Sequence, residues 1–293
     1  MNPTPLVVKC GGHAAVDHAA VCADVADLAR AGRYVVLVHG GSADIDRLAG
    51  RLGVPHRRLT GPDGRTARYT DPATLDVVVT ALAGIVKPRL LAQLAQAGVP
   101  AVGLTGLDAG LLRARRPAAI RAVVDGEGGP RVVRDDHGGR IVEVDPRLIT
   151  RLLEAGAVPV VSPPALTAEG ECVNVDADRA AAALAGALGA ETLVLLTGAP
   201  GVLSRPGDET SLLRECRLPA TGLPPYAQGG MRSKLTAARD ALRSGVETVL
   251  VADGRGTGPL RAALSGRATR ILLDTGRPVR QAATVTTGPG QRR

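Results

Sequence analysis

The fold is decided by two stretches of sequence, Leu6-Val-Val-Lys-Cys-Gly-Gly12 and Tyr34-Val-Val-Leu-Val-His-Gly-Gly-Ser42. In each, a short apolar run ends at a glycine pair and a helical pattern follows. The first helical pattern is rich in alanine and reaches about Arg30, and the second begins near Ser42, whose hydroxyl suits an N-cap. Two such units so close together predict an α/β fold with parallel strands.

The remaining chain alternates in the same way and indicates two lobes. Helical patterns cover residues 72–97, 146–155, 176–188 and 230–244, and strands are expected at 100–104, 158–161, 192–196, 247–252 and 269–273. We interpret the apolar runs at 123–124, 131–134 and 141–144, separated by Gly-rich turns, as a β-hairpin excursion from the sheet. We place the lobe boundary beside Pro163-Pro164, with lobes at 1–165 and 166–276, and expect a disordered tail at 277–293.

Composition indicates a folded protein without a membrane span. The chain has 293 residues and 45% apolar content, enough for a sizeable core. No apolar run reaches about 18 residues, and the start of the chain lacks the pattern of a signal peptide. Four scattered cysteines without a C-x-x-C pair indicate reduced, buried thiols and no zinc site. We therefore expect a cytoplasmic protein with no protein-bound metal.

The charge is basic and unevenly placed. Lys and Arg total 36 against 28 Asp and Glu, and the stretch from Arg47 to Arg68 holds six arginines and one acid, Asp63. Solvated arginines are the simplest interpretation of this stretch, and a surface for an acidic partner is the alternative. Nucleic-acid binding is disfavoured, because Trp and Phe are absent and no known nucleic-acid motif occurs.

Lysine is rare, which makes each lysine informative. Only Lys9, Lys87 and Lys234 occur; every other cation is an arginine. A lysine retained against this background is a candidate for a compact point charge that a planar guanidinium cannot replace. Lys9 directly precedes one glycine pair, and Lys234 lies shortly after another. We predict that these two lysines act together at an anion site, with chance survival as the alternative.

Glycine pairs recur where an anion could bind. Gly11-Gly12, Gly40-Gly41 and Gly229-Gly230 each precede a helical pattern. Without a Cβ atom the backbone can approach an anion closely, and the first N–H groups of the helix point towards it. Neither G-x-x-x-x-G-K-[ST] nor a G-x-G-x-x-G after the first strand is present. The pairs predict an anion site of another kind.

Two further segments carry polar residues suited to a site. Asn174, Asp176 and Asp178 open a helix, where acids stabilise the helix dipole and could also orient lysines or a polar substrate. Asp71 before Pro72 suits an N-cap followed by a proline in the first turn. Arg68 has no structural role visible in the sequence, so we predict that it recognises a carboxylate.

Taken in order, these residues resemble the amino acid kinase family over residues 6–273. The motifs are K-x-G-G at Lys9, H-G-G-S at His39, R-Y-T-D at Arg68, G-L-T-G-x-D at Gly103, N-V-D-A-D at Asn174 and G-G-M-x-x-K at Gly229. Within the family the chain is most similar to the acetylglutamate kinase branch, and closest to its kinases of carrier-protein-bound 2-aminoadipate. The runs at 39–42, 161–166, 208–214 and 227–231 carry that closer similarity.

The resemblance implies transfer of a phosphoryl group from ATP to a side-chain carboxylate. A carboxylate is already a nucleophile, so charge neutralisation and positioning suffice and no general base is needed. By position, Lys9 and Lys234 match the family's two catalytic lysines, and Asp178 matches the aspartate that holds them. The matching substrate-binding positions are Gly40, Gly41, Arg68 and Asn174, and the phosphate-binding positions are Gly11, Gly12 and Gly230.

The resemblance also implies an architecture and partners. The family has a three-layer α/β/α sandwich with a mainly parallel open sheet, the amino acid in the N-terminal lobe, ATP in the C-terminal lobe, and dimers formed through the N-terminal lobe. Mg²⁺ is expected on the ATP phosphates. The expected substrate is 2-aminoadipate, glutamate or a related amino acid joined to a small acidic amino-group carrier protein, in lysine or arginine biosynthesis. Free N-acetylglutamate is the alternative substrate, and a non-catalytic amino-acid sensor is disfavoured by the retention of both lysines and Asp178.

Three positions depart from the family pattern. Lys87 stands where asparagine is common, and we interpret it as structural, with contact to substrate or a partner subunit as the alternative. Gly198 stands where an acid or amide is frequent near the nucleotide, and Ala109 replaces a common glycine. These departures leave the nucleotide preference and the exact substrate open.

Overall fold

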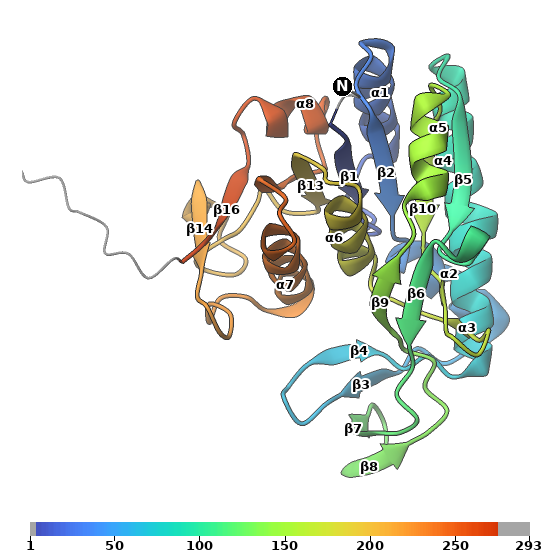
Figure 1. The fold of residues 1–293 in the computed structure, drawn as a ribbon. Coiled ribbons are helices and arrows are strands. Elements are labelled where there is room, and N and C mark those ends of the chain that lie inside the picture. The colour runs from blue at the N-terminus through green and yellow to red at the C-terminus, as the bar shows by residue number, and fades with distance from the viewer. Residues whose placement is uncertain (1–3, 275–293) are drawn as a thin grey trace, which may run out of the picture.

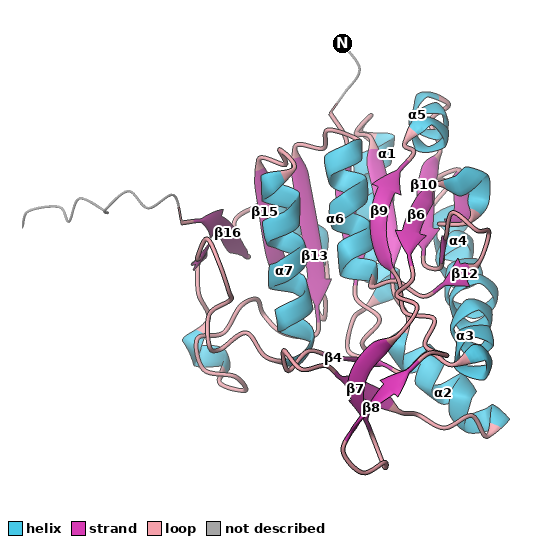
Figure 2. Ribbon diagram, turned by 60° about the horizontal axis from the view of Figure 1, so that its bottom comes forward, coloured by secondary structure: helices cyan, strands magenta, loops and turns pink. Residues whose placement is uncertain are grey.

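A computed structural model describes residues 4–274 of the chain. Its centre is an open eight-stranded sheet with helices on both faces (Figure 1, Figure 2). The strand order is β14 (Glu215–Leu218), β16 (Thr269–Leu273), β15 (Thr248–Asp253), β13 (Thr192–Thr197), β1 (Leu6–Cys10), β2 (Val35–His39), β10 (Val158–Ser162) and β5 (Ala101–Thr105). Neighbouring strands are parallel except β15 and β16. The predicted mainly parallel, open α/β/α sandwich is confirmed.

Helices bury the sheet from both sides, which explains the uninterrupted apolar runs. One face is covered by α1 (His18–Arg30), α4 (Lys87–Gln96) and α8 (Pro259–Leu264). The other is covered by α5 (Arg147–Glu154), α6 (Ala177–Ala187) and α7 (Gly229–Arg243). Every residue of β1, β2 and β10 is buried. Such runs are typical of parallel strands covered on both faces.

The helical pattern predicted at 72–97 is one continuous helical stretch with a change of pitch. It begins as α3 (Pro72–Val79), passes through a π-helical segment (Thr80–Val86) and continues as α4. Asp71 is the N-cap, since its carboxylate accepts a hydrogen bond from the Thr74 N–H. Together with α2 (Ser42–Leu52), this stretch buries a small apolar cluster of its own.

Two small sheets extend from the main one, and they correct the predicted hairpin excursion. The first has the order β4 (Thr66–Arg68), β3 (Arg58–Thr60), β7 (Ile120–Val124) and β8 (Pro130–Val133). The second has the order β12 (Cys172–Val173), β11 (Ala165–Leu166), β6 (Leu112–Arg115) and β9 (Arg140–Val144). Residues 120–133 do form a hairpin, but 141–144 belongs to the other sheet. The strand β9 pairs with β6 in an antiparallel manner, whereas β7 and β8 share a separate apolar core with Leu59 and Tyr69.

One local prediction at a helix start was wrong. Ser42 is the first residue of α2 and not its N-cap, and its hydroxyl donates to the Gly12 carbonyl at 2.8 Å. Gly229-Gly230 opens α7 but does not follow a strand, because a long connection separates it from the end of β14. Only the first two glycine pairs are therefore turns between a strand and the helix after it. The helix α8 and the strands β3, β4, β6, β11, β12 and β14 were not predicted.

The topology singles out the carboxyl ends of β1 and β13. From β1 the chain crosses through α1 to β2, whereas from β13 it crosses through α7 to β15 on the opposite side. In open α/β sheets ligands bind at such a switch point, outside the carboxyl ends of the strands. The division at residue 165 stays a prediction, and the expected disordered tail lies outside the described residues. No helix between residues 4 and 274 is long and apolar enough to cross a membrane.

Candidate active site

Lys9, Asp178 and Lys234 meet beside this switch point. The alternation of β1 directs Val7 and Lys9 to the face covered by α6 and α7, while Val8 and Cys10 face the other side. The Lys9 Nζ lies 2.7 Å from one carboxylate oxygen of Asp178, and the Lys234 Nζ lies 3.1 Å from the other. Asp178 is in the first turn of α6 and Lys234 in the second turn of α7. One carboxylate thus bridges the two lysines that the sequence singled out.

The three charges are buried and depend on one another. Lys9 and Asp178 are each 5% exposed, and Lys234 is 8% exposed. Burial alone would raise the pKa of Asp178, but the two ammonium groups outweigh it and lower that pKa to about 2. Burial would likewise lower the pKa of Lys9, but the Asp178 carboxylate raises it. One carboxylate therefore faces two ammonium groups, so the cluster carries a net charge of +1.

The first two glycine turns touch each other next to this cluster. The Cα atom of Gly12 lies so close to the Gly41 backbone that any side chain at residue 12 would collide with it. The Gly12 carbonyl accepts hydrogen bonds from the Ala43 N–H at 3.0 Å and from the Ser42 hydroxyl. Gly40 faces the first residue of α6, Ala177. Glycine is required here because two backbones approach each other, and the turns open towards the N-terminal ends of α2 and α6.

A cavity of about 600 Å³ lies between β4, β9 and the N-terminal ends of α6 and α7. Three of the predicted site residues line it, namely Arg68, Asn174 and Gly230, whereas Lys9, Lys234 and the first two glycine pairs do not. Its charged lining residues are Arg58, Arg65, Arg68, Arg140, Arg179 and Arg232 against Asp136 and Asp176. The cavity is therefore strongly positive and suits an anionic ligand.

Arg68 has a structural contact that the sequence did not reveal. Its guanidinium pairs with the Asp46 carboxylate of α2 at 2.6 Å, and Asp46 also contacts His56. Arg68 therefore does have a structural role, in joining β4 to α2. The side chain still lines the cavity, so its predicted contact with substrate stays a prediction.

Several residues at the cavity were missed by the sequence analysis. The Ser233 hydroxyl donates to Asp176 at 2.7 Å, joining the starts of α6 and α7. Asp136 accepts the Thr70 and Gly138 N–H groups, and the Asn174 amide donates to the Thr70 hydroxyl at 3.3 Å. Ser233 adjoins Lys234 within the recognised motif and could have been found there. Asp136 lies in a loop with no local signal.

The basic stretch at 47–68 is largely neutralised within the protein. Four of its six arginines form ion pairs, namely Arg47 with Asp44, Arg57 with Asp71, Arg65 with Asp63 and Arg68 with Asp46. Three cavity arginines, Arg58, Arg140 and Arg232, have no ion pair with any residue between 4 and 274. Two arginines of the stretch have no ion pair among residues 4–274; Arg58 lines the cavity and Arg51 does not.

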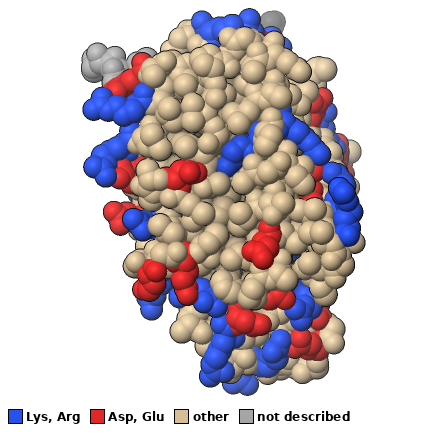
Figure 3. Space-filling view, turned by 90° about the vertical axis from the view of Figure 1, so that its right-hand side faces the viewer, with Lys and Arg blue, Asp and Glu red and all other residues tan. Residues whose placement is uncertain are grey.

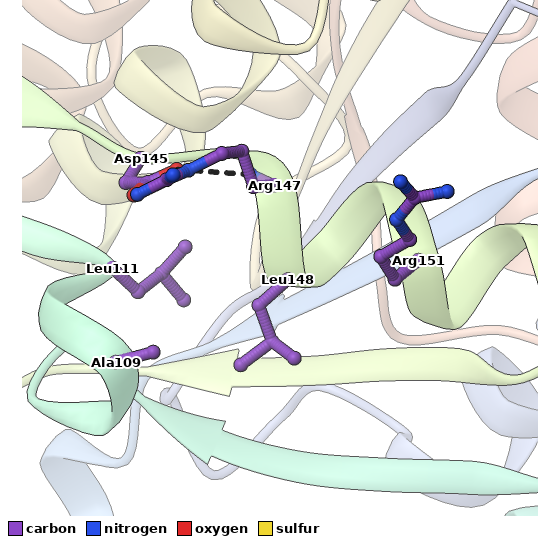
Figure 4. A pocket seen from close by; sticks show the side chains of 6 residues that line it. All are labelled: Ala109, Leu111, Asp145, Arg147, Leu148 and Arg151. Atoms are coloured by element: carbon purple, nitrogen blue, oxygen red, sulfur yellow. Dashed lines mark hydrogen bonds and ion pairs between the residues drawn. The ribbon is translucent and has the colours of Figure 1, made fainter.

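A smaller cavity of about 260 Å³ shares no residue with the first (Figure 4). Ala109, Leu111 and Leu148 form its apolar wall, with Arg151 and the Asp145–Arg147 ion pair beside them. Ala109 has a φ of 52°, the left-handed region that favours glycine. This backbone conformation fits the glycine that the family resemblance leads us to expect at this position.

Known proteins of the predicted family are similar to this chain over most of its length. The sequence profile described as "Amino acid kinase family" matches residues 4–253. A [LysW]-aminoadipate kinase of Thermus thermophilus is 43% identical over 91% of this chain and 99% of its own length. An acetylglutamate kinase of Pelotomaculum thermopropionicum is 35% identical over 85% of this chain and 84% of its own length.

Solved structures agree with these sequence matches. The crystal structure of smu.665 from Streptococcus mutans covers 92% of this chain and 99% of its own, with a TM-score of 0.70 and 25% identity. A carbamate kinase of Giardia, at 14% identity, shares the fold with a TM-score of 0.63. Two buried lysines contact one carboxylate, two glycine turns touch each other, and the matches extend over nearly the whole length of the chain. This chain belongs to the amino acid kinase family.

Proposed function

We propose that this protein transfers the γ-phosphoryl group of ATP to the side-chain carboxylate of an amino acid carried by a small acidic amino-group carrier protein. The carried amino acid would be 2-aminoadipate, glutamate or a related compound, and the product an acyl phosphate. The support is the 43% identity to a [LysW]-aminoadipate kinase over nearly its full length, against 35% for an acetylglutamate kinase. The bridged lysine pair is the observation on which the chemistry rests.

The bridged lysines suit the charge that such a reaction develops. Both substrates are anions, so the chief requirement is to neutralise the transferred phosphoryl group and hold the two reacting oxygens in line. Asp178 fixes the position of Lys9 and Lys234 while leaving a net charge of +1 for the phosphoryl oxygens. The N–H groups of Gly11 and Gly12, and of Gly230 in α7, would bind the phosphates. Mg²⁺ would be held by the ATP phosphates and add positive charge there.

The arginine-lined cavity favours a carried acceptor over a free one. Arg68 and Asn174 would bind the amino acid, with Gly40 and Gly41 beside the reacting carboxylate. The cavity volume falls within the roughly 300–1,000 Å³ of sites for drug-sized ligands. It leaves room for the end of a carrier chain beside the amino acid. The unpaired Arg58 and Arg140 would attract an acidic carrier.

An ATP-dependent hydroxamate assay tests this proposal, because hydroxylamine traps acyl phosphates. Carrier-bound 2-aminoadipate and glutamate and free N-acetylglutamate would each be supplied, with the Lys9→Arg variant as the control for contaminating kinases. We expect hydroxamate from a carrier-bound substrate. Strong activity on free N-acetylglutamate with none on carrier-bound substrates would contradict the proposal and establish an acetylglutamate kinase.

The family resemblance further suggests a cytoplasmic homodimer formed through the N-terminal lobe. The strand β5 is at the edge of the main sheet and pairs with β10 on one side, and its Val102 is 36% exposed. The face at this side of the molecule is mainly uncharged in its upper half (Figure 3). Unpaired strand edges with exposed apolar residues are suited to association. Light scattering on the wild type and on Val102→Lys tests the dimer, which the added charge should weaken.

A further inference from the structure

The loop after β1 lies across the carboxyl ends of three neighbouring strands. Gly11 packs against the Leu196 carbonyl of β13, and Val16 packs against Gly254, the residue after β15. The Asp17 N–H donates to the Gly254 carbonyl at 2.8 Å. Any ligand that extends from the glycine turns towards β13 and β15 must therefore pass along this loop.

His13 occupies the space that a side chain at residue 198 would take. A Cβ atom built on Gly198 would lie 2.8 Å from the His13 Nδ1 and 3.3 Å from its Cγ. The imidazole is exposed, and its Nδ1 accepts the Ala15 N–H at 3.2 Å. In the neutral ring the proton is then on Nε2. Among the described residues, none forms a hydrogen bond with that nitrogen.

We propose that His13 is a nucleotide-binding residue whose Nε2–H donates to a phosphate oxygen of ATP at the carboxyl ends of β1 and β13. The proposal rests on the proposed function, which puts the γ-phosphoryl group at Gly12, Lys9 and Lys234. The rest of the triphosphate then extends from the glycine turns towards the C-terminal strands, past the imidazole. Gly198 is part of this arrangement, because its missing side chain makes room for the ring. His13, which follows β1, thus supplies a polar group beside Gly198, which follows β13 and has no side chain.

Titration calorimetry with ADP and Mg²⁺ tests this proposal without any acceptor. Because a hydrogen bond to a charged group is lost, His13→Ala should weaken ADP binding about tenfold. His13→Gln, which keeps an N–H donor of similar reach, should stay within about threefold of the wild type. His56→Ala, which removes a histidine paired with Asp46 on α2, is the matched control and should leave ADP binding unchanged.

A double-mutant cycle tests the shared space. Gly198→Asn should weaken ADP binding in the wild type, because its side chain collides with the imidazole. In the His13→Ala background the same substitution should cost less or restore binding, so the two effects should not add. Unchanged binding in His13→Ala, or additive effects in the double variant, would overturn the inference. A wild type that binds ADP but phosphorylates no carrier-bound carboxylate would overturn the proposed function alone.

Discussion

Lys9 and Lys87 are equally buried on opposite faces of the same sheet, yet their surroundings differ in one decisive respect. Each is 5% exposed. Lys9 contacts the Asp178 carboxylate, whereas Lys87 has no ion pair or hydrogen bond with any residue between 4 and 274. Lys87 packs its methylene groups against Gly103 of β5. Burial lowers the pKa of Lys87 to about 8, with only partial compensation from Asp108, while Asp178 raises the pKa of Lys9.

The comparison shows that burial alone does not indicate what a lysine does. Removing an ammonium group from water disfavours its charged form unless an anion takes the place of the water. A lysine that must stay charged against a phosphoryl group therefore needs a carboxylate partner. Lys9 and Lys234 share one, and Lys87 has none. The low dielectric of the protein interior strengthens the ion pair of Lys9 with Asp178. The same low dielectric makes the unpaired charge of Lys87 costly in free energy.

The largest effect is expected from replacing Lys9 or Lys234 with arginine. The guanidinium keeps the charge but cannot take the position of a compact ammonium on Asp178, so phosphoryl transfer should slow about 10²–10⁴-fold, as for loss of one transition-state donor. Steady-state turnover measures this, and circular dichroism checks the fold. Lys87→Arg is the matched control, with turnover within a few-fold of the wild type. Equal losses of turnover in all three variants would contradict the difference in role between the paired lysines and Lys87.

A second prediction concerns the Asp178 carboxylate, which Lys9 contacts and Lys87 does not. Asp178→Asn leaves two buried ammonium groups without a counter-charge, which resembles breaking a buried ion pair at about 3–5 kcal/mol of unfolding free energy. Urea unfolding at pH 7 measures this loss. Asp240→Asn, which removes an exposed partner of Arg179, is the control and should cost less than about 1 kcal/mol.

Protein stability at acidic pH gives an independent check on the Asp178 carboxylate. The folded pKa of Asp178 is about 2, below the ordinary 3.8, so its stabilising effect is complete above pH 3.8 and is lost as the pH falls towards 2. As the pH falls through this range, the wild type should therefore lose more unfolding free energy than the Asp178→Asn variant. A variant as stable as the wild type at pH 7 would show that the lysines do not need their carboxylate.

Much of this arrangement could be predicted from the sequence, because the decisive signals are local. The glycine pairs and the scarcity of lysine single out Lys9 and Lys234, and the family resemblance adds Asp178. The catalytic roles of all three stay predictions. Arg140 and Arg179 were not singled out, since only the packing of β9 and α6 brings them to the cavity. The pairing of Arg68 with Asp46 and of β9 with β6 likewise joins distant segments. Local patterns indicate strands and turns but not which strands pair.

The smallest effect, and the one that sharpens the comparison most, is expected at Lys87. Its ammonium group is buried without a partner, so Lys87→Met should raise the unfolding free energy at pH 7, where the wild-type group is charged in both states. The lowering of the pKa from 10.5 to about 8 corresponds to at most about 3 kcal/mol. Thermal and urea unfolding of the two proteins at pH 7 measure this difference, while the hydroxamate assay reports whether activity is retained.

The pH dependence separates this charge effect from a change in packing. Between about pH 8 and 10.5 the unfolded chain holds a proton on Lys87 that the folded protein does not, so wild-type stability gains from this group as the pH rises. The advantage of Lys87→Met should therefore be largest below pH 8 and shrink towards pH 10. An advantage independent of pH would reflect packing alone. A destabilised and inactive Lys87→Met protein would mean that this ammonium binds an anion supplied by a ligand or a second subunit. Lys87 would then have an anionic partner as Lys9 does, but one that binds after folding and is not part of the fold.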